Sequence, residues 1–277
     1  MVQAQWIIRE TLCKKSIMSI LEVRNLTVNF GGILAVNEVS FTVDKGEVYS
    51  IIGPNGAGKT TIFNCLNGIY KPNSGNIIFD DHLINGMRPY KIAGRGIART
   101  FQNIELFSRM TTMENLMLGR HLHMKTGVWT GASLFTSRSR AALEEIKHRE
   151  MIEKIIDLLD LQSARDHFVG ELPYGRQKLV ELGRALALEP KLLLLDEPSA
   201  GMNNEEKQDL FFWIKDILNF FNLTILMIEH DMNMVRDVSD RVLAINFGKK
   251  IAEGTPLEVS KHPEVQKAYL GEDKQDA

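Results

Sequence analysis

Cysteine and long apolar runs are both scarce in this sequence. Cys13 and Cys65 are its only two cysteines, too few to form a disulfide framework. No apolar stretch approaches the ~18 residues that would span a bilayer. The first seventeen residues scatter their charges, unlike a signal peptide. These absences predict a cytoplasmic protein with reduced thiols.

The chain also lacks an excess of charge of either sign. Thirty-three basic residues against thirty-five acidic ones give a formal net charge of −2. Such a balance offers no overall electrostatic attraction for nucleic acid or for an anionic membrane. With 44% hydrophobic and 25% charged residues, the 277-residue sequence is typical of a globular protein of one large or two modest domains. Any partner must therefore be recognised locally.

The clearest positive signal is a segment that fits the phosphate-binding pattern G-x-x-x-x-G-K-[ST] at every fixed position. A strand-forming run at 48–52 precedes it, and apolar residues at helical spacing follow it. Its glycines permit positive φ, so several backbone N–H groups turn towards one point and cradle an anion. This context places the Lys59 ammonium near β- and γ-phosphates and the Thr60 hydroxyl where it coordinates Mg²⁺. The segment consists of Gly53, Pro54, Asn55, Gly56, Ala57, Gly58, Lys59, Thr60 and Thr61.

Strand-like and helical segments alternate around this loop. Segments within 21–43 predict an antiparallel β part, and residues 140–161 carry the apolar stripe of a helix. The apolar runs at 192–195 and 223–228 are typical of buried parallel strands. The sequence therefore predicts an α/β fold: a P-loop NTPase core with a mainly parallel sheet, an N-terminal antiparallel β subdomain and an inserted α-helical subdomain.

The domain limits follow from composition. Residues 18–271 should form the main domain, with the helical subdomain at about 104–190, between an extension at 1–17 and a polar tail at 272–277. Methionines such as Met113 and Met117 suit either core packing or an adaptable groove for a partner helix. The histidines between residues 121 and 167, including His148, show no ligand spacing and are expected to be solvated.

Ionisable residues follow two of the predicted parallel strands. Asp196 and Glu197 come after 192–195, and His230 comes after 223–228. Because α/β sheets bind ligands at the carboxyl ends of their strands, these groups are candidates for a Mg²⁺ partner and a base for water. His230 could contact a γ-phosphate there. Phe30, at the end of an N-terminal strand, suits either stacking on a nucleotide base or core packing.

In combination, these motifs resemble the ATP-binding subunit of an ABC transporter, over residues 19–271. The phosphate loop is followed by Gln102 at a strand end, by the signature-like turn LPYGRQ at 172–177, by DEPSAGMN at 196–203 and by His230. The resemblance implies that Lys59 binds the β- and γ-phosphates of ATP and that Phe30 stacks on adenine. It also implies that Thr60, Gln102 and Asp196 surround Mg²⁺.

The resemblance further implies that Gln102, Glu197 and His230 form the catalytic set, with Glu197 as the general base. Gly175, next to Tyr174, would offer its N–H to ATP bound by the opposite subunit, so a monomer would hold half of each site. One departure concerns the signature turn, because Pro173 and Tyr174 replace the usual serine and first glycine. The hydroxyl contact to the γ-phosphate is therefore missing.

The partners implied by the resemblance are membrane permease subunits, a second ABC ATPase subunit and, indirectly, a substrate-binding protein, with no nucleic acid. The protein would lie peripherally on the inner face of the cell membrane. The variant signature, the insertion at 126–137 and the ending AYLG at 268–271 are similar to branched-chain amino acid importers. Relatives for urea or short amides share much of this, and the ATPase does not touch the cargo, so the cargo stays open.

Two other classes of function compete with this interpretation. A non-transport ABC ATPase working on DNA or ribosomes would usually carry coiled coils, two nucleotide domains or basic patches, which this sequence lacks. A P-loop kinase for a small molecule would leave the turn at 172–177 and His230 without a role. Phosphate transfer to an acceptor other than water would identify such a kinase.

Overall fold

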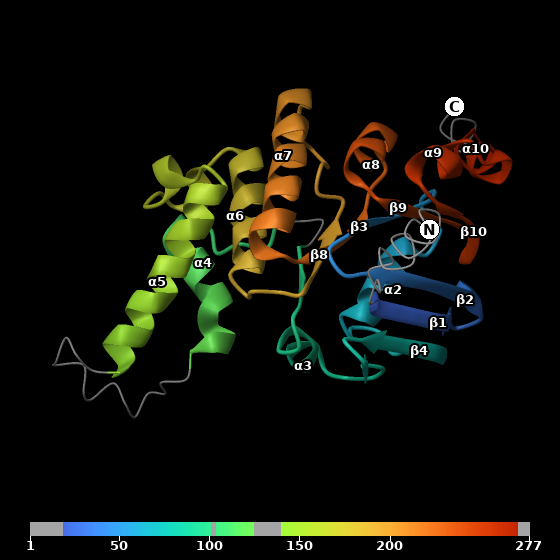
Figure 1. The fold of residues 1–277 in the computed structure, drawn as a ribbon, viewed down its shortest axis with the longest axis horizontal. Coiled ribbons are helices and arrows are strands. Elements are labelled where there is room, and N and C mark those ends of the chain that lie inside the picture. Colours follow the sequence, from blue (N-terminus) through green and yellow to red (C-terminus); the bar gives the residue numbers. More distant parts are fainter. Residues whose placement is uncertain (1–18, 101–103, 125–139, 271–277) are drawn as a thin grey trace, which may run out of the picture.

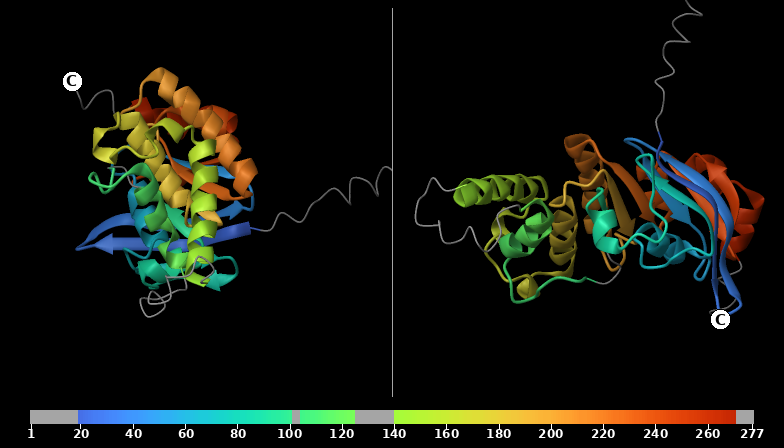
Figure 2. Two further views of the ribbon diagram at one scale, coloured as in Figure 1. Left: turned by 90° about the vertical axis from the view of Figure 1, so that its left-hand side faces the viewer. Right: turned by 90° about the horizontal axis from the view of Figure 1, so that it is seen from below.

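The computed structural model describes residues 19–100, 104–124 and 140–270 of the chain. Two β-sheets lie at one end of the molecule and a group of helices at the other, as Figure 1 and the right-hand view in Figure 2 show. The larger sheet has the order β10-β9-β3-β8-β7-β6, and the smaller one has the order β2-β1-β4-β5. The α/β fold predicted from the sequence, with an antiparallel sheet beside a mainly parallel one, is confirmed.

The smaller sheet is antiparallel throughout its pairs. Residues 21–28 belong to a single strand, which has a register shift between Val23 and Leu26. Asn25 takes a positive φ of 47° at this irregularity, which lets the strand continue. Its strands are β1 (Ser19–Phe30), β2 (Ile33–Asp44), β4 (Ser74–Phe79) and β5 (His82–Leu83).

The larger sheet is parallel from β9 to β6, and only β10 runs antiparallel, as a hairpin with β9. Every residue of its three central strands is buried, because helices or the smaller sheet cover both faces. The strands are β3 (Val48–Ile52), β6 (Ile97–Arg99), β7 (Leu192–Asp196), β8 (Thr224–Ile228), β9 (Arg241–Asn246) and β10 (Lys249–Gly254).

The helical end of the molecule is built mainly from chain between β6 and β7. It contains α4 (Thr112–Gly119), η1 (Arg120–His123), α5 (Arg140–Leu158), η3 (Gln162–Ala164), η4 (Val169–Glu171) and α6 (Tyr174–Leu186). The remaining helices are α2 (Lys59–Leu66), α3 (Pro89–Ala93), α7 (Asn204–Phe221), α8 (Met232–Val238), α9 (Pro256–Ser260) and α10 (Pro263–Leu270). Within the described residues, no helix is both long and apolar enough to cross a membrane.

Two expectations about the helical region are resolved by burial. Met113 is 7% exposed and belongs to the core, so core packing is its role, while Met117 packs against the same core from a half-buried position. The expectation that His148 is solvated is wrong, because its residue is 4% exposed. Its Nδ1 accepts a hydrogen bond from Arg120 Nε at 3.1 Å. This bond gives the buried ring nitrogen the partner that water would otherwise supply.

Candidate functional site

Three neighbouring parallel strands bring the predicted chemical groups to one edge of the larger sheet. Ile51 of β3 is level with Ile228 of β8, and Ile228 is level with Asp196 of β7. The phosphate-binding segment, Asp196 with Glu197, and His230 therefore leave the sheet side by side at its carboxyl edge. This is the edge at which open α/β sheets bind ligands.

The phosphate-binding segment connects β3 directly to α2. Gly58 caps the helix in a left-handed conformation, with φ 104°, and α2 begins at Lys59. The Lys59 side chain is buried, and its Nζ donates to the carbonyl oxygens of Gly53 at 2.6 Å and Pro54 at 2.9 Å. The lysine thus folds back over the start of the loop, while Thr60 and Asn55 are exposed. A helix N-terminus and its oriented N–H groups are suited to a phosphate.

Neighbouring backbone confines this loop from behind. Gly53 and Gly58 have positive φ of 150° and 104°, and a Cβ at Gly58 would lie 2.5 Å from the carbonyl oxygen of Ala35 in β2. A Cβ at Gly53 would collide with the carbonyl oxygen of Ile245 in β9. Gly248, between β9 and β10, donates its N–H to Ala57 O at 3.0 Å. The glycines are therefore required both by conformation and by space.

Asp196, at the end of β7, is held by a buried ion pair. Arg99 Nη2 donates to Asp196 Oδ2 at 2.6 Å, and the two side chains are 6% and 4% exposed. Arg99 Nη1 also donates to Asn64 Oδ1 at 2.7 Å, which joins the strand to α2. Arg99 was not predicted as a site residue, because no motif marks it as a partner of Asp196.

Glu197 and His230 form the most informative pair in the site. His230 Nε2 lies 2.8 Å from Glu197 Oε1, and the side chains are partly exposed. Glu197 adopts a positive φ of 49°, an uncommon conformation for a residue with a side chain, and its N–H donates to Ile228 O at 2.9 Å. A carboxylate that faces solvent beside an imidazole can accept a proton from water.

Glu229 is a further organising residue that the sequence did not single out for a role. Its carboxylate is 2% exposed and accepts from backbone N–H groups of Ser199 at 2.9 Å, His230 at 2.9 Å and Asp231 at 3.2 Å. These bonds join the turn after β7 to the turn after β8. The positions of Glu197 and His230 therefore depend on Glu229, although nothing in its local sequence distinguishes it from its neighbours.

Comparisons with known proteins match this arrangement over nearly the whole chain. The family model described as ABC transporter matches residues 36–200, and the model described as Branched-chain amino acid ATP-binding cassette transporter matches residues 249–275. The chain belongs to the ABC transporter ATP-binding family.

Relatives and a solved structure agree with this assignment. The chain is 44% identical to the high-affinity branched-chain amino acid transport ATP-binding protein BraF of Pseudomonas aeruginosa, over 91% of this chain and 98% of the relative. It is 42% identical to LivG of Escherichia coli, over 91% and 98%. A crystal structure of the ADP conformation of an ATP-binding cassette has a TM-score of 0.78 at 33% identity, and the match covers 92% of this chain and 99% of that one.

The signature-like turn of this ABC protein lies at the start of α6, away from the phosphate loop along the chain. Tyr174 is 46% exposed and its ring is adjacent to Gly201, where a Cβ would lie 2.9 Å from the ring. Gly175 is buried, and a Cβ there would collide with Glu206 Oε1. Within one chain, the turn therefore packs against the turn after β7 and the start of α7.

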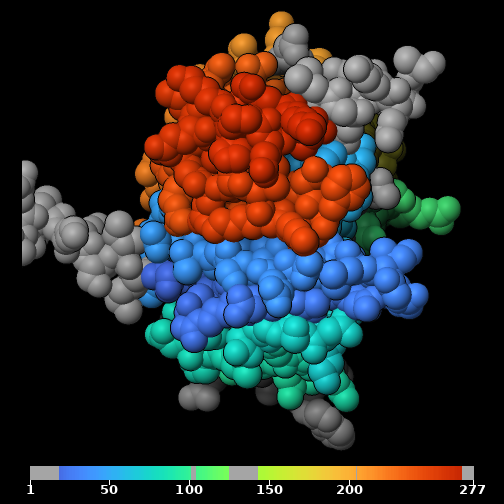
Figure 3. Space-filling model, turned by 90° about the vertical axis from the view of Figure 1, so that its right-hand side faces the viewer, coloured from blue at the N-terminus to red at the C-terminus, as the bar shows by residue number. Residues whose placement is uncertain are grey.

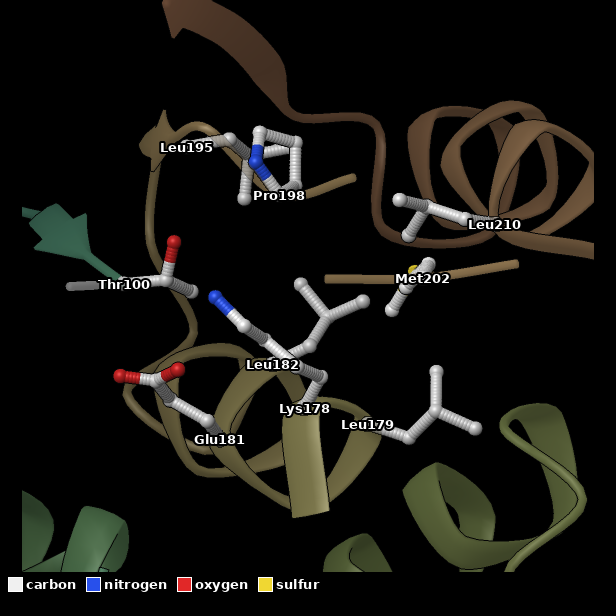
Figure 4. Close-up of a pocket in the computed structure, with 9 residues that line it drawn as sticks. All are labelled: Thr100, Lys178, Leu179, Glu181, Leu182, Leu195, Pro198, Met202 and Leu210. Atoms are coloured by element: carbon white, nitrogen blue, oxygen red, sulfur yellow. The ribbon is translucent and has the colours of Figure 1, made fainter. Parts of the chain in front are cut away.

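Lys178 places a buried cation one turn further along α6. Figure 4 shows its amine pointing towards Thr100 and Pro198 across a small cavity of about 20 Å³. Burial lowers the pKa of the Lys178 ammonium, while the negative charges of Glu181, Asp196, Glu197 and Glu229 oppose this shift. Its Nζ also lies 5.8 Å from the centroid of the Tyr174 ring. This cation thus lies between the signature-like turn and the acidic edge.

The exposure of Phe30 decides between its two expected roles, base stacking and core packing. It ends β1 with 44% exposure, and its ring meets Tyr70 edge-on at 5.1 Å. The ring is therefore an exposed aromatic surface rather than a core residue, as base stacking requires. Gln102 was expected beside Mg²⁺ and lies outside the described residues.

The oxygen atoms of Thr60 and Asp196 fit the chemistry of Mg²⁺, which prefers hydroxyl, carboxylate and phosphate oxygens. Arg99 pairs with Oδ2 of Asp196, so the carboxylate is oriented before any ion binds. In the described part of the chain, no group of three or more His, Cys, Asp or Glu is arranged as a metal site.

Proposed function

We propose that this chain binds and hydrolyses ATP as the energy-coupling subunit of an importer, and that the cargo is branched-chain amino acids. The names of the BraF and LivG relatives support this cargo. The observation that carries the chemistry is the Glu197–His230 contact of 2.8 Å at the sheet edge that also carries the phosphate loop. It supports Glu197 as the general base for water.

Each site residue receives a role in this proposal. Backbone N–H groups of residues 53–61 bind the phosphates, with Lys59 exchanging its carbonyl partners for β- and γ-phosphate oxygens. Thr60, Asp196 and Gln102 would hold Mg²⁺, which supplies charge stabilisation at the phosphates. His230 would orient the γ-phosphate and Glu197, and Phe30 would stack on adenine.

Tyr174 and Gly175 are proposed to complete the site of a second ATPase subunit. The start of α6 supplies N–H groups that suit a phosphate, and Pro173 provides no side-chain cap that would occupy them. Lys178 places a positive charge nearby. Each monomer then carries a phosphate loop with its base at one place and a signature-like turn at another. Hydrolysis therefore requires two subunits that face each other, so that the turn of one meets the phosphate loop of the other.

The domain limits proposed are 18–271 for the ATPase domain, about 104–190 for its helical subdomain, and 1–17 and 272–277 for extension and tail. The permease-facing surface is proposed on the helical end, where Phe107 and Phe168 are 58% and 48% exposed. Their segments are joined by a hydrogen bond from Gly170 N to Ser108 O at 3.0 Å. Binding there would hold the protein on the inner face of the membrane, with a substrate-binding protein as an indirect partner.

Glu197→Gln tests the chemistry and the assembly together. Removing the base should abolish hydrolysis but keep ATP binding, so the closed dimer should accumulate in Mg-ATP and light scattering should show a shift from monomer to dimer. The wild-type protein, which turns ATP over, serves as the control and should show a smaller dimer fraction. A Glu197→Gln protein that still hydrolyses ATP at the wild-type rate would exclude Glu197 as the base.

A further inference from the structure

The first residue of the phosphate loop is held by the last described helix of the chain. Gly53 donates its backbone N–H to the hydroxyl oxygen of Tyr269 at 2.9 Å, across 216 positions of sequence. Tyr269 belongs to the AYLG ending, which the proposed mechanism leaves without a role. We propose that Tyr269 is a positioning residue for the phosphate loop and that α10 thereby sets the affinity for ATP.

The tyrosine hydroxyl is fixed relative to β3 by an apolar cluster. Tyr269 is half-buried and packs against a cluster that includes Ile52, Val242, Ala244 and Val265. Ile52 is the last residue of β3 and directly precedes Gly53. Figure 3 shows the C-terminal residues packed on the N-terminal strands as one continuous surface. The ring is therefore anchored to the same strand whose end its hydroxyl contacts.

Gly53 is restrained on three sides. Its N–H is bonded to Tyr269, its carbonyl oxygen accepts from Lys59 Nζ at 2.6 Å, and its α-carbon lies close to the carbonyl oxygen of Ile245. The Tyr269 bond fixes the orientation of the peptide that enters the loop, and therefore the direction of the following peptides. Without the hydroxyl, the N–H would lose its acceptor and the loop entrance would gain freedom.

The expected consequence concerns binding rather than chemistry. Glu197 and His230 belong to other strands, so loss of the Tyr269 hydroxyl leaves the base and its partner in place. If ATP must order the loop when it binds, the free-energy cost of that ordering weakens binding of ATP and of the transition state equally. Such a uniform loss raises KM for ATP and leaves kcat unchanged. A net hydrogen bond corresponds to a roughly 3- to 10-fold rise in KM for ATP.

Tyr269→Phe is the decisive variant, because it keeps the ring packing and removes only the hydroxyl. Tyr49→Phe is the matched control: Tyr49 belongs to β3, is fully buried, and donates its hydroxyl to Glu253 Oε1 of β10 at 2.8 Å, not to the loop backbone. Both variants should lower the melting temperature. Only Tyr269→Phe should raise KM for ATP, at unchanged kcat.

A second readout does not depend on turnover. Amide hydrogen exchange of a peptic fragment covering 50–56, which excludes position 49, should be faster in Tyr269→Phe than in the wild type and than in Tyr49→Phe. The KM measurement rests on the proposed ATPase function, whereas the hydrogen-exchange measurement tests the bond between Gly53 and Tyr269 directly. Absence of ATPase activity in the wild type would refute the proposed function alone. An unchanged KM in Tyr269→Phe, or exchange equal to the wild type, would overturn the positioning role.

Discussion

The buried pair of Arg99 and Asp196 provides a sharp test of how the catalytic edge is held together. The two side chains are almost fully buried with 2.6 Å between Nη2 and Oδ2, and Arg99 also reaches Asn64 in α2. Arg99→Met retains much of the side-chain volume but leaves the Asp196 carboxylate buried without its cation. Truncating one member of such a pair costs about 3–5 kcal/mol. The variant should therefore be folded but strongly destabilised.

Urea unfolding followed by far-ultraviolet circular dichroism measures this loss. With an m-value of about 2 kcal/mol per molar urea, the midpoint should fall by roughly 1.5–2.5 M. The control is Arg149→Met, which breaks the ion pair between Arg149 and Glu145. These two side chains are 57% and 51% exposed. That change should cost no more than about 0.5 kcal/mol. Equal midpoints for the two variants would refute the idea that the Arg99 pair supports the site.

Two further predictions concern ionisable groups outside the loop. Burial raises the pKa of Glu47 to about 6, so the native state holds this proton more tightly than the unfolded chain does. Stability should therefore fall by at most about 1.5 kcal/mol as pH rises from 4.5 to 7.5, and by less where solvent screens the carboxylate. Glu47→Gln should remove that part of the pH dependence, measured as unfolding free energy at pH 4.5 and pH 7.5; an unchanged difference would contradict it. Lys178→Met removes a buried ammonium whose pKa burial lowers, so the unfolding free energy of the wild type should rise relative to that of the variant between pH 7.5 and pH 10. Lys215→Met, which removes an exposed cation that lies over Phe211 in α7, is the control. An equal pH dependence in the wild type and in Lys178→Met would contradict this.

Local patterns were sufficient for the phosphate loop and for the groups at the strand ends. A loop between a strand and a helix has few geometries once its glycines and lysine are fixed, and parallel strands bring their carboxyl ends together. The helix at 204–221 was not predicted, although Asn203 and Glu206 form a reciprocal capping box at the start of α7. That box was a readable signal.

Other features depend on contacts that no local pattern contains. Arg99 meets a carboxylate 97 positions away, and Tyr269 meets an amide 216 positions away. Met113 shows a different limit, because a methionine suits a core and a docking groove equally, and only its burial decides between them. A Met113→Asp change would thus place a charge in the core rather than test a partner surface.

The site divides into groups fixed to the sheet and groups fixed to the helical end. The N–H of Glu197 donates to Ile228 O at the end of β8, and its carboxylate contacts His230. The positions of the base and the histidine are therefore fixed by the adjacent strands β7 and β8. Tyr174 belongs to α6 and meets this set through the turn at Gly201. A shift of the helical end would therefore carry the signature-like turn with it while leaving the base and its histidine paired. A membrane partner bound at that end could then control assembly of the two-subunit site without altering the chemistry at the sheet edge.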